Sequence, residues 1–223
     1  MSVATSYHAW RARRSVLRGV SAAGCVTFAV LAMAAAGSPP TSLDVAVRSA
    51  VMRAAPSAWL HGVFSALSSL GSVLVLGPVA CLAVFGLWRR GTNHRVAQAA
   101  LLSMASVVLT WALKVGFHRT RPPGAMQIPG LGFSFPSGHS LQTMAIGVTV
   151  AYVLYREGLV ARWAVYAAIL FSVLVGMSRV YLDVHWATDV LAGWCGGVVI
   201  AGGCALLYEA SRRRSDISRD GGR

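Results

Sequence analysis

Three short polar stretches interrupt the apolar second half of the chain: KVGFHRTRP at 114–122, PSGH at 136–139 and SRVYLDVHWATD at 178–189. We expect six of their side chains to meet in one pocket, three of them cations, two histidines and one a carboxylate: Lys114, Arg121, Arg179, His139, His185 and Asp189. The remainder of the sequence is typical of a scaffold that brings these stretches together.

The composition indicates a membrane protein. The chain has 223 residues, of which 56% are hydrophobic and 12% charged, and its mean hydropathy is +0.60. Long runs without charge at this hydropathy are typical of a single compact membrane domain. The formal charge of +13 at first suggests nucleic acid, but the basic residues form short runs between apolar segments. Cytoplasmic retention of arginine explains that pattern better, so we expect no nucleic-acid partner.

We predict an all-α integral membrane fold with six transmembrane helices. The expected spans lie near 19–36, 69–88, 96–117, 138–155, 163–177 and 185–208, in one domain over 19–208. A basic N-terminal tail (1–18) and a basic, solvated and disordered C-terminal tail (209–223) flank it. An alternative for the first segment is a secretory signal cleaved near 34–37, although the apolar run is close to full spanning length.

A short amphipathic helix is predicted between the first two spans. Thr41-Ser-Leu-Asp44 fits a capping box, and apolar residues then recur every three or four positions until Pro56. This pattern favours a helix lying at the membrane surface, and a plain connecting loop is the alternative.

The distribution of charge predicts the orientation. With six spans, one side holds both tails and the turns 89–95 and 156–162, which together carry 14 of the 20 basic residues. By the positive-inside rule both termini are then cytoplasmic. The three polar stretches all fall on the outer face, and the protein is expected in the plasma membrane.

Lys114, Arg121 and Arg179 would repel one another unless an anion completed the set. Arginine offers a planar fork to phosphate oxygens and lysine a point charge, so phosphate is the expected anion. The alternative is that such side chains extend to the lipid headgroups, and we prefer that alternative for Arg119. His61, His94 and His118 lack comparable context and are expected at the surface.

Pro136-Ser-Gly-His139 precedes an apolar helix. Ser137 is predicted as its N-cap, and Gly138 would let backbone N–H groups approach an anion at the positive end of the helix dipole. His139 would face the same place from the first turn. We predict phosphate-binding roles for Ser137 and Gly138.

His185 and Asp189 are four residues apart, so on a helix they share a face. A carboxylate there can hold the imidazole in one tautomer and leave the other nitrogen free as a nucleophile. Small residues continue this face at Gly193, Gly197, Ala201 and Ala205, and predict close packing of a neighbouring helix. We expect no metal at His139, His185 and Asp189, because three adjacent cations would repel it. The four cysteines show no metal-ligand spacing and are interpreted as small apolar residues.

At these residues the chain resembles the type-2 phosphatidic acid phosphatase family of membrane lipid phosphatases. Its three motifs match Lys-x6-Arg-Pro at 114–122, Pro-Ser-Gly-His at 136–139 and Ser-Arg-x5-His-x3-Asp at 178–189. The resemblance implies six helices, no cofactor and a metal-independent mechanism. It also implies that His185 attacks phosphorus, Asp189 orients His185, and His139 protonates the leaving oxygen. The cations and the 137–139 backbone would bind the phosphate oxygens.

The leading hypothesis is a lipid phosphate or diphosphate phosphatase with membrane lipids as partners. Undecaprenyl diphosphate is the lead substrate of this undecaprenyl-diphosphatase-like chain, and phosphatidic acid or phosphatidylglycerophosphate is the alternative. A lipid phosphotransferase could use the same pocket, although the short outer loops offer no sign of an acceptor site. A vanadate-dependent haloperoxidase is disfavoured by the spans, and a transporter would not need His185 and Asp189. The sequence does not indicate an oligomeric state.

Overall fold

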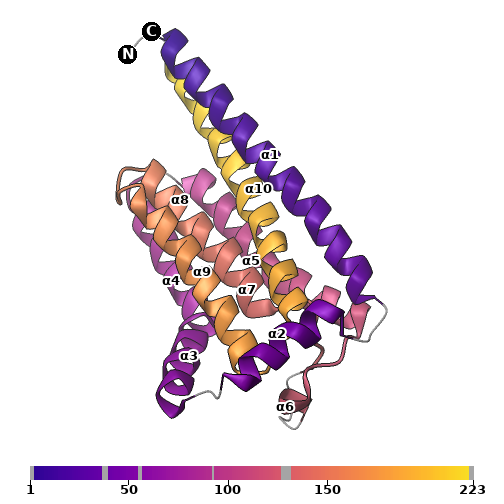
Figure 1. Ribbon diagram of the computed structural model, residues 1–223. Coiled ribbons are helices and arrows are strands. Elements are labelled where there is room, and N and C mark those ends of the chain that lie inside the picture. The colour runs from indigo at the N-terminus through magenta and orange to yellow at the C-terminus, as the bar shows by residue number, and fades with distance from the viewer. Residues whose placement is uncertain (1–2, 37–39, 55–56, 92, 127–131, 221–223) are drawn as a thin grey trace.

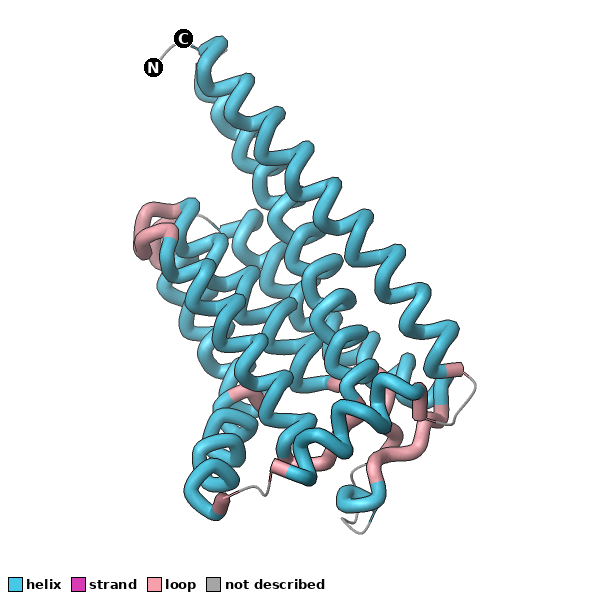
Figure 2. The backbone as a smooth tube through the Cα atoms, viewed as in Figure 1, coloured by secondary structure: helices cyan, strands magenta, loops and turns pink. Residues whose placement is uncertain are grey.

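The computed structural model describes residues 3–36, 40–54, 57–91, 93–126 and 132–220. Within these ranges every regular element is a helix and none is a strand (Figure 2). The elements are α1 (Val3–Ala35), α2 (Ser42–Arg53), α3 (Ala58–Leu70), α4 (Val73–Trp88), α5 (Asn93–Phe117), α6 (Pro123–Met126), α7 (Gly138–Gln142), the π-helical turn η1 (Thr143–Gly147), α8 (Val148–Arg156), α9 (Trp163–Tyr181) and α10 (Ala187–Asp220). The all-α prediction is confirmed.

Four helical segments are long and apolar enough to cross a membrane: Trp10–Ala35, Gln98–Phe117, Trp163–Tyr181 and Ala187–Arg214. The bent pair α3–α4 would make a fifth if it forms one span. The predicted span at 138–155 exists as a helical run, but η1 divides it into pieces that are each too short to cross alone. The described residues therefore give four or five candidate spans and support a multi-pass membrane protein.

The second predicted span, 69–88, is longer and broken in the structure. Helix α3 ends at Leu70, α4 begins at Val73, and the two are bent by 45°. A Cβ on Gly71 would lie 2.5 Å from the side chain of Val175 on α9. The break thus falls where α9 comes so close that only glycine fits.

Helices α1 and α10 lie side by side along most of their length, and α10 also contacts α5, α7 and η1 (Figure 1). The first turns of α1, the last turns of α10 and the α8–α9 connection lie at one end of the bundle. Helices α2 and α6 lie at the other end (Figure 1).

The C-terminal segment is not the disordered tail that we expected, because α10 continues as a helix to Asp220. Glu209 is 2% exposed, forms an ion pair with Arg156 at 2.8 Å and accepts a hydrogen bond from Tyr152 at 2.9 Å. Arg212 also donates to the backbone carbonyl of Arg156. These contacts to the end of α8 hold α10 beyond the predicted span at 185–208, and the sequence pattern does not reveal them.

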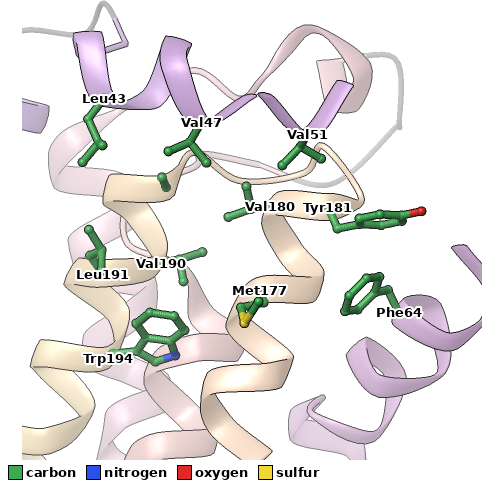
Figure 3. A pocket seen from close by; sticks show the side chains of 11 residues that line it. Leu43, Val47, Val51, Phe64, Met177, Val180, Tyr181, Val190, Leu191 and Trp194 are labelled. Atoms are coloured by element: carbon green, nitrogen blue, oxygen red, sulfur yellow. The ribbon is translucent and has the colours of Figure 1, made fainter. Parts of the chain in front are cut away.

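Helix α2 begins with the predicted capping box, in which Asp44 N donates to Thr41 Oγ1 at 3.2 Å and Thr41 N to Asp44 Oδ2 at 3.0 Å. Arg48 donates to both oxygens of Asp183 and joins α2 to the α9–α10 link at 2.7 and 2.8 Å. The apolar side of α2 covers a pocket of about 360 Å³, whose walls come from α3, α9 and α10 (Figure 3). The lining side chains are Leu43, Val47, Val51, Phe64, Met177, Val180, Tyr181, Ala187, Val190, Leu191 and Trp194.

The predicted small-residue face of α10 packs against α7 and η1. A Cβ on Gly193 would lie 2.8 Å from Ser137 O, and a Cβ on Gly197 would lie 2.7 Å from Leu141 O. Ala201 and Ala205 continue this buried face. The predicted close helix packing is therefore confirmed, and it sets α10 against the start of the 138–156 helical run.

We predict that Gly197→Ala destabilises the folded protein by about 1–3 kcal/mol, because the added methyl group meets fixed backbone and must move α10 away. Gly203→Ala is the matched control, since a Cβ at Gly203 meets no atom within 4 Å. Thermal unfolding in detergent measures both variants. Equal midpoints for the two would contradict the close packing.

Candidate active site

The three polar stretches meet at the end of the bundle that carries α2 and α6. Lys114 lies in the last turn of α5, and its Nζ donates to Phe133 O at 2.6 Å and Ser134 O at 3.4 Å. The carbonyl groups of Phe133 and Ser134 thus point toward the ammonium group of Lys114 at the end of α5. This contact fixes the loop that leads to the second stretch.

Arg121 is 7% exposed and spreads its donors over several acceptors. It donates to Val184 O at 2.6 Å, Gly132 O at 2.9 Å and Phe133 O at 3.2 Å. Burial lowers the pKa of Arg121, but these carbonyls solvate the guanidinium in place of water. Arg121 therefore ties the first stretch to the loop that precedes His185.

The NH1 group of Arg121 also lies 3.1 Å from His185 Nε2. A guanidinium has only donors, so Nε2 must accept with its lone pair and the ring proton must sit on Nδ1. Burial, followed by the charges of Lys114, Arg121 and Arg179, holds the pKa of His185 well below its ordinary value. The imidazole is thus neutral, with the lone pair of Nε2 directed at Arg121.

Asp189 faces the other side of that ring. Its Oδ2 lies 3.5 Å from His185 Nδ1 and accepts hydrogen bonds from the Ser134 hydroxyl and from Trp186 N, the latter at 2.9 Å. Ser134 Oγ is itself 3.4 Å from His185 Nδ1. Ser134 is therefore a residue of this site that the motifs did not reveal.

The local geometry of the pair differs from the prediction. His185 lies in the link before α10, which begins at Ala187, whereas Asp189 lies in the first turn of that helix. The two side chains approach because Asp189 folds back over the helix start and binds the N–H of Trp186. Their proximity was predicted correctly, but not the shared helix face.

Our expectation that Arg119 extends to lipid headgroups is wrong. Arg119 is 0% exposed and forms ion pairs with Asp44 Oδ2 at 2.7 Å and with Asp189 Oδ1 at 2.6 Å. It also donates to Thr188 Oγ1 at 2.7 Å. No pattern in the sequence indicates this network, because the capping role accounts for Asp44 without a second partner.

Arg179 near the end of α9 is 9% exposed and donates from NH1 to Ser68 on α3. Its Nε is buried and has no hydrogen-bond partner among the described residues. His139, in the first turn of α7, interacts electrostatically with Arg179, Lys114 and Arg121. The predicted cations and His139 are therefore brought together, and Arg179 keeps a donor available.

Ser137 precedes α7 as predicted, but its side chain makes no capping bond to the helix. Its hydroxyl accepts from Ser140 Oγ at 3.0 Å, and its backbone N–H donates to Asp189 O at 3.0 Å. A Cβ on Gly138 would lie 3.3 Å from Thr110 on α5. The second stretch is thus joined through its backbone to the third, and Gly138 lies close to α5.

His118 is exposed, stacks edge-on against Phe133 and has a positive φ of 49°, so it belongs to the surface as expected. No group of three His, Cys, Asp or Glu side chains within the described ranges is arranged to hold a metal ion.

The comparisons with known proteins agree with this geometry. Residues 95–213 match the model of the PAP2 superfamily, a segment that contains all three stretches. The chain belongs to the PAP2 superfamily. The family predicted from the motifs is therefore confirmed.

Two relatives and one solved structure show how far the similarity extends. Phosphatidylglycerophosphatase B of Bacillus subtilis is 31% identical over 78% of this chain and 87% of its own length. Undecaprenyl-diphosphatase of Sulfolobus acidocaldarius is 30% identical over 61% of this chain and 65% of its own length. The crystal structure of a transmembrane PAP2-type phosphatidylglycerolphosphate phosphatase from Bacillus subtilis aligns with a TM-score of 0.73 at 26% identity, covering 87% of this chain and 96% of that one. These relatives are phosphatases, and the predicted enzyme class is confirmed.

We predict that His185 stays neutral between pH 8 and pH 6, because its lowered pKa moves protonation to more acidic conditions. Imidazole NMR shifts of the detergent-solubilised protein measure this, with the His185 signal assigned by its loss in His185→Asn. A midpoint at or above 6.5 would contradict the arrangement of Nε2 against Arg121.

Proposed function

We propose that this protein hydrolyses a phosphate or diphosphate headgroup of a membrane lipid through a phosphohistidine on His185. The observation that carries the proposal is the neutral imidazole whose Nε2 lone pair points toward Arg121. Lys114, Arg179 and His139 surround the same place. Phosphoryl transfer needs mainly in-line positioning and preorganised positive charge, and this group of residues supplies both.

In the first step, the Nε2 lone pair forms a bond to phosphorus as the bond from phosphorus to the leaving oxygen breaks. His139 gives its proton to that oxygen. The negative charge of a bound phosphate would favour the protonated form of His139 that this step requires. Asp189 accepts from Nδ1–H and stabilises the positive charge that develops on the ring.

In the second step, water attacks the phosphohistidine, His139 takes a proton from the water, and the N–P bond breaks. Inorganic phosphate leaves and His185 returns to its neutral form. We propose that Lys114, Arg121, Arg179 and the backbone N–H groups of Gly138 and His139 bind the phosphate oxygens in both steps. Ser137, whose own N–H is bound to Asp189 O, would hold this helix start in place. No step requires a metal ion, since the charges that a metal would supply come from these cations.

The membrane arrangement follows from the charge distribution. We propose that the bent α3–α4 pair and the 138–156 helical run complete six spans in one domain over 19–208, with basic tails at 1–18 and 209–223. The 14 basic residues of the tails and two turns would then lie on the cytoplasmic side of the plasma membrane. The candidate site, at the opposite end of the bundle, would face outward.

Two lipid substrates are supported by different observations. Undecaprenyl diphosphate is our lead from the sequence, because an outward-facing enzyme with short loops suits recycling of a lipid carrier, and one relative carries that activity in its name. Phosphatidylglycerophosphate is favoured by the relative and the solved structure that cover most of this chain. Phosphatidic acid is the third headgroup that the pocket suits.

We predict that the purified protein releases phosphate from at least one of these three lipids in EDTA, and that His185→Asn loses more than about 1,000-fold in kcat. His118→Asn is the matched control, because that histidine lies in the neighbouring loop at the surface and asparagine tolerates its positive φ. The fastest of the three lipids identifies the substrate.

Two results would overturn the proposal. Activity that survives in His185→Asn would exclude the phosphohistidine, and a folded wild-type protein that releases no phosphate from any of the lipids would exclude hydrolysis.

A further inference from the structure

Arg119 holds two carboxylates from distant parts of the chain in a site closed to solvent. Its NH2 reaches Asp44 on α2 and its NH1 reaches Asp189 on α10, and the side chains of all three residues are 0% exposed. Thr188 completes the group, since its N–H and its hydroxyl donate to Asp44 Oδ1 at 2.9 and 3.0 Å. Both terminal nitrogens of the guanidinium are thus bound to carboxylates, whereas Arg119 Nε has no hydrogen-bond partner among the described residues.

The two oxygens of Asp189 have different partners. Arg119 binds Oδ1, whereas Oδ2 accepts from Ser134 and Trp186 N and faces His185 Nδ1. The guanidinium therefore fixes the rotation of the carboxylate that presents Oδ2 to the imidazole. It also places a positive charge on the far side of that carboxylate, and Asp44 partly offsets this charge.

We propose that Arg119 and Asp44 are positioning residues that set the ionisation of His185 through Asp189. This role rests on the proposed function, in which neutral His185 is the nucleophile. Neither residue reaches His185 itself. Through this network, helix α2 at the end of the bundle becomes part of the catalytic unit.

Other charges also act on His185 and must be distinguished from this pair. Lys114 on α5, Arg121 in the following loop, His139 on α7 and Arg179 on α9 all disfavour its protonation. Asp183 in the α9–α10 link is bound to Arg48 of α2 and to the N–H of Gly124. Asp189 is the carboxylate on the Nδ1 side, and Arg119 and Asp44 act through it.

Substitutions of Arg119 and Asp44 are expected to change the pKa of His185 in different ways. Arg119→Gln removes a cation from Asp189, so negative charge near His185 increases and its pKa should rise. Asp44→Asn leaves the charge of Arg119 uncompensated against Asp189, so the pKa of His185 should stay at the wild-type value or fall. In Arg119→Gln, kcat should drop by about 10- to 100-fold with little change in KM, because Arg119 supports the site without touching phosphate.

Thr188→Val is the matched control, since it removes hydrogen bonds from the same network without changing a charge. We expect it to lower the thermal midpoint and to leave the pKa of His185 unmoved. The double variant Asp44→Asn/Arg119→Gln should give a pKa between those of the two single variants. Circular dichroism and thermal unfolding establish which variants are folded.

The experiment is NMR titration of His185 in the full-length wild type and these variants in detergent, beside the pH dependence of kcat/KM. The role is supported by an upward shift in Arg119→Gln, no shift or a downward shift in Asp44→Asn, and no shift in Thr188→Val. Shifts of the same sign in both charge variants, or lowered midpoints without any shift, would overturn it. The titration needs no substrate, so it remains decisive even if wild-type protein releases no phosphate and the proposed hydrolysis fails.

Discussion

The cost of burying charge in an apolar bundle governs the site end of this protein. Arg119 has no exposed surface and is held by two carboxylates, whereas Arg121 and Lys114 are held largely by backbone carbonyls. An unpaired charge in such surroundings costs several kcal/mol. The carbonyls of residues 132–134 are therefore turned toward these cations. These contacts hold that short segment against the end of α5.

The cost of burying charge also determines the protonation state of His185. Because cations crowd the Nε2 side of His185 and a carboxylate lies on the Nδ1 side, the ring is neutral and its tautomer is defined before any substrate arrives. Arg179 retains a buried donor, its Nε, that no described residue satisfies. A phosphate group would relieve the repulsion among these cations and supply the missing acceptor. The cations of the free site therefore suit an anionic group.

Helix α10 connects scaffold and site. Its N-terminal turn carries Asp189, and one and two turns later Gly193 and Gly197 allow close approach of the backbone at Ser137 and Leu141. This approach lets Ser137 N donate to Asp189 O, so that the second and third stretches are joined directly. At its other end α10 binds the end of α8 through Glu209 and Arg212. The position of the carboxylate is therefore fixed by packing along the whole helix.

Local patterns in the sequence were sufficient for a large part of this description. The capping box at Thr41, the small-residue face at Gly193 and Gly197, the all-helical class and the superfamily motifs each depend on residues close together in the chain. The break at Gly71 and the helical C-terminal segment were not predicted, because Val175, Arg156 and Tyr152 approach them from distant positions. Residue types that recur at helical spacing can be recognised in the sequence alone. The distant residue that a single side chain contacts cannot be recognised in this way.

The sequence by itself predicted which side chains meet in the candidate site: the three motif cations, His139, His185 and Asp189. Only the tertiary structure decided how their charges are balanced. Arg119 pairs with Asp44 and Asp189 across 75 and 70 residues of chain, and Ser134 enters the site from a loop whose path depends on Lys114 and Arg121. Such contacts follow from the requirement that a buried charge be paired. The partners are close in the folded protein, but they occur at no regular spacing in the sequence.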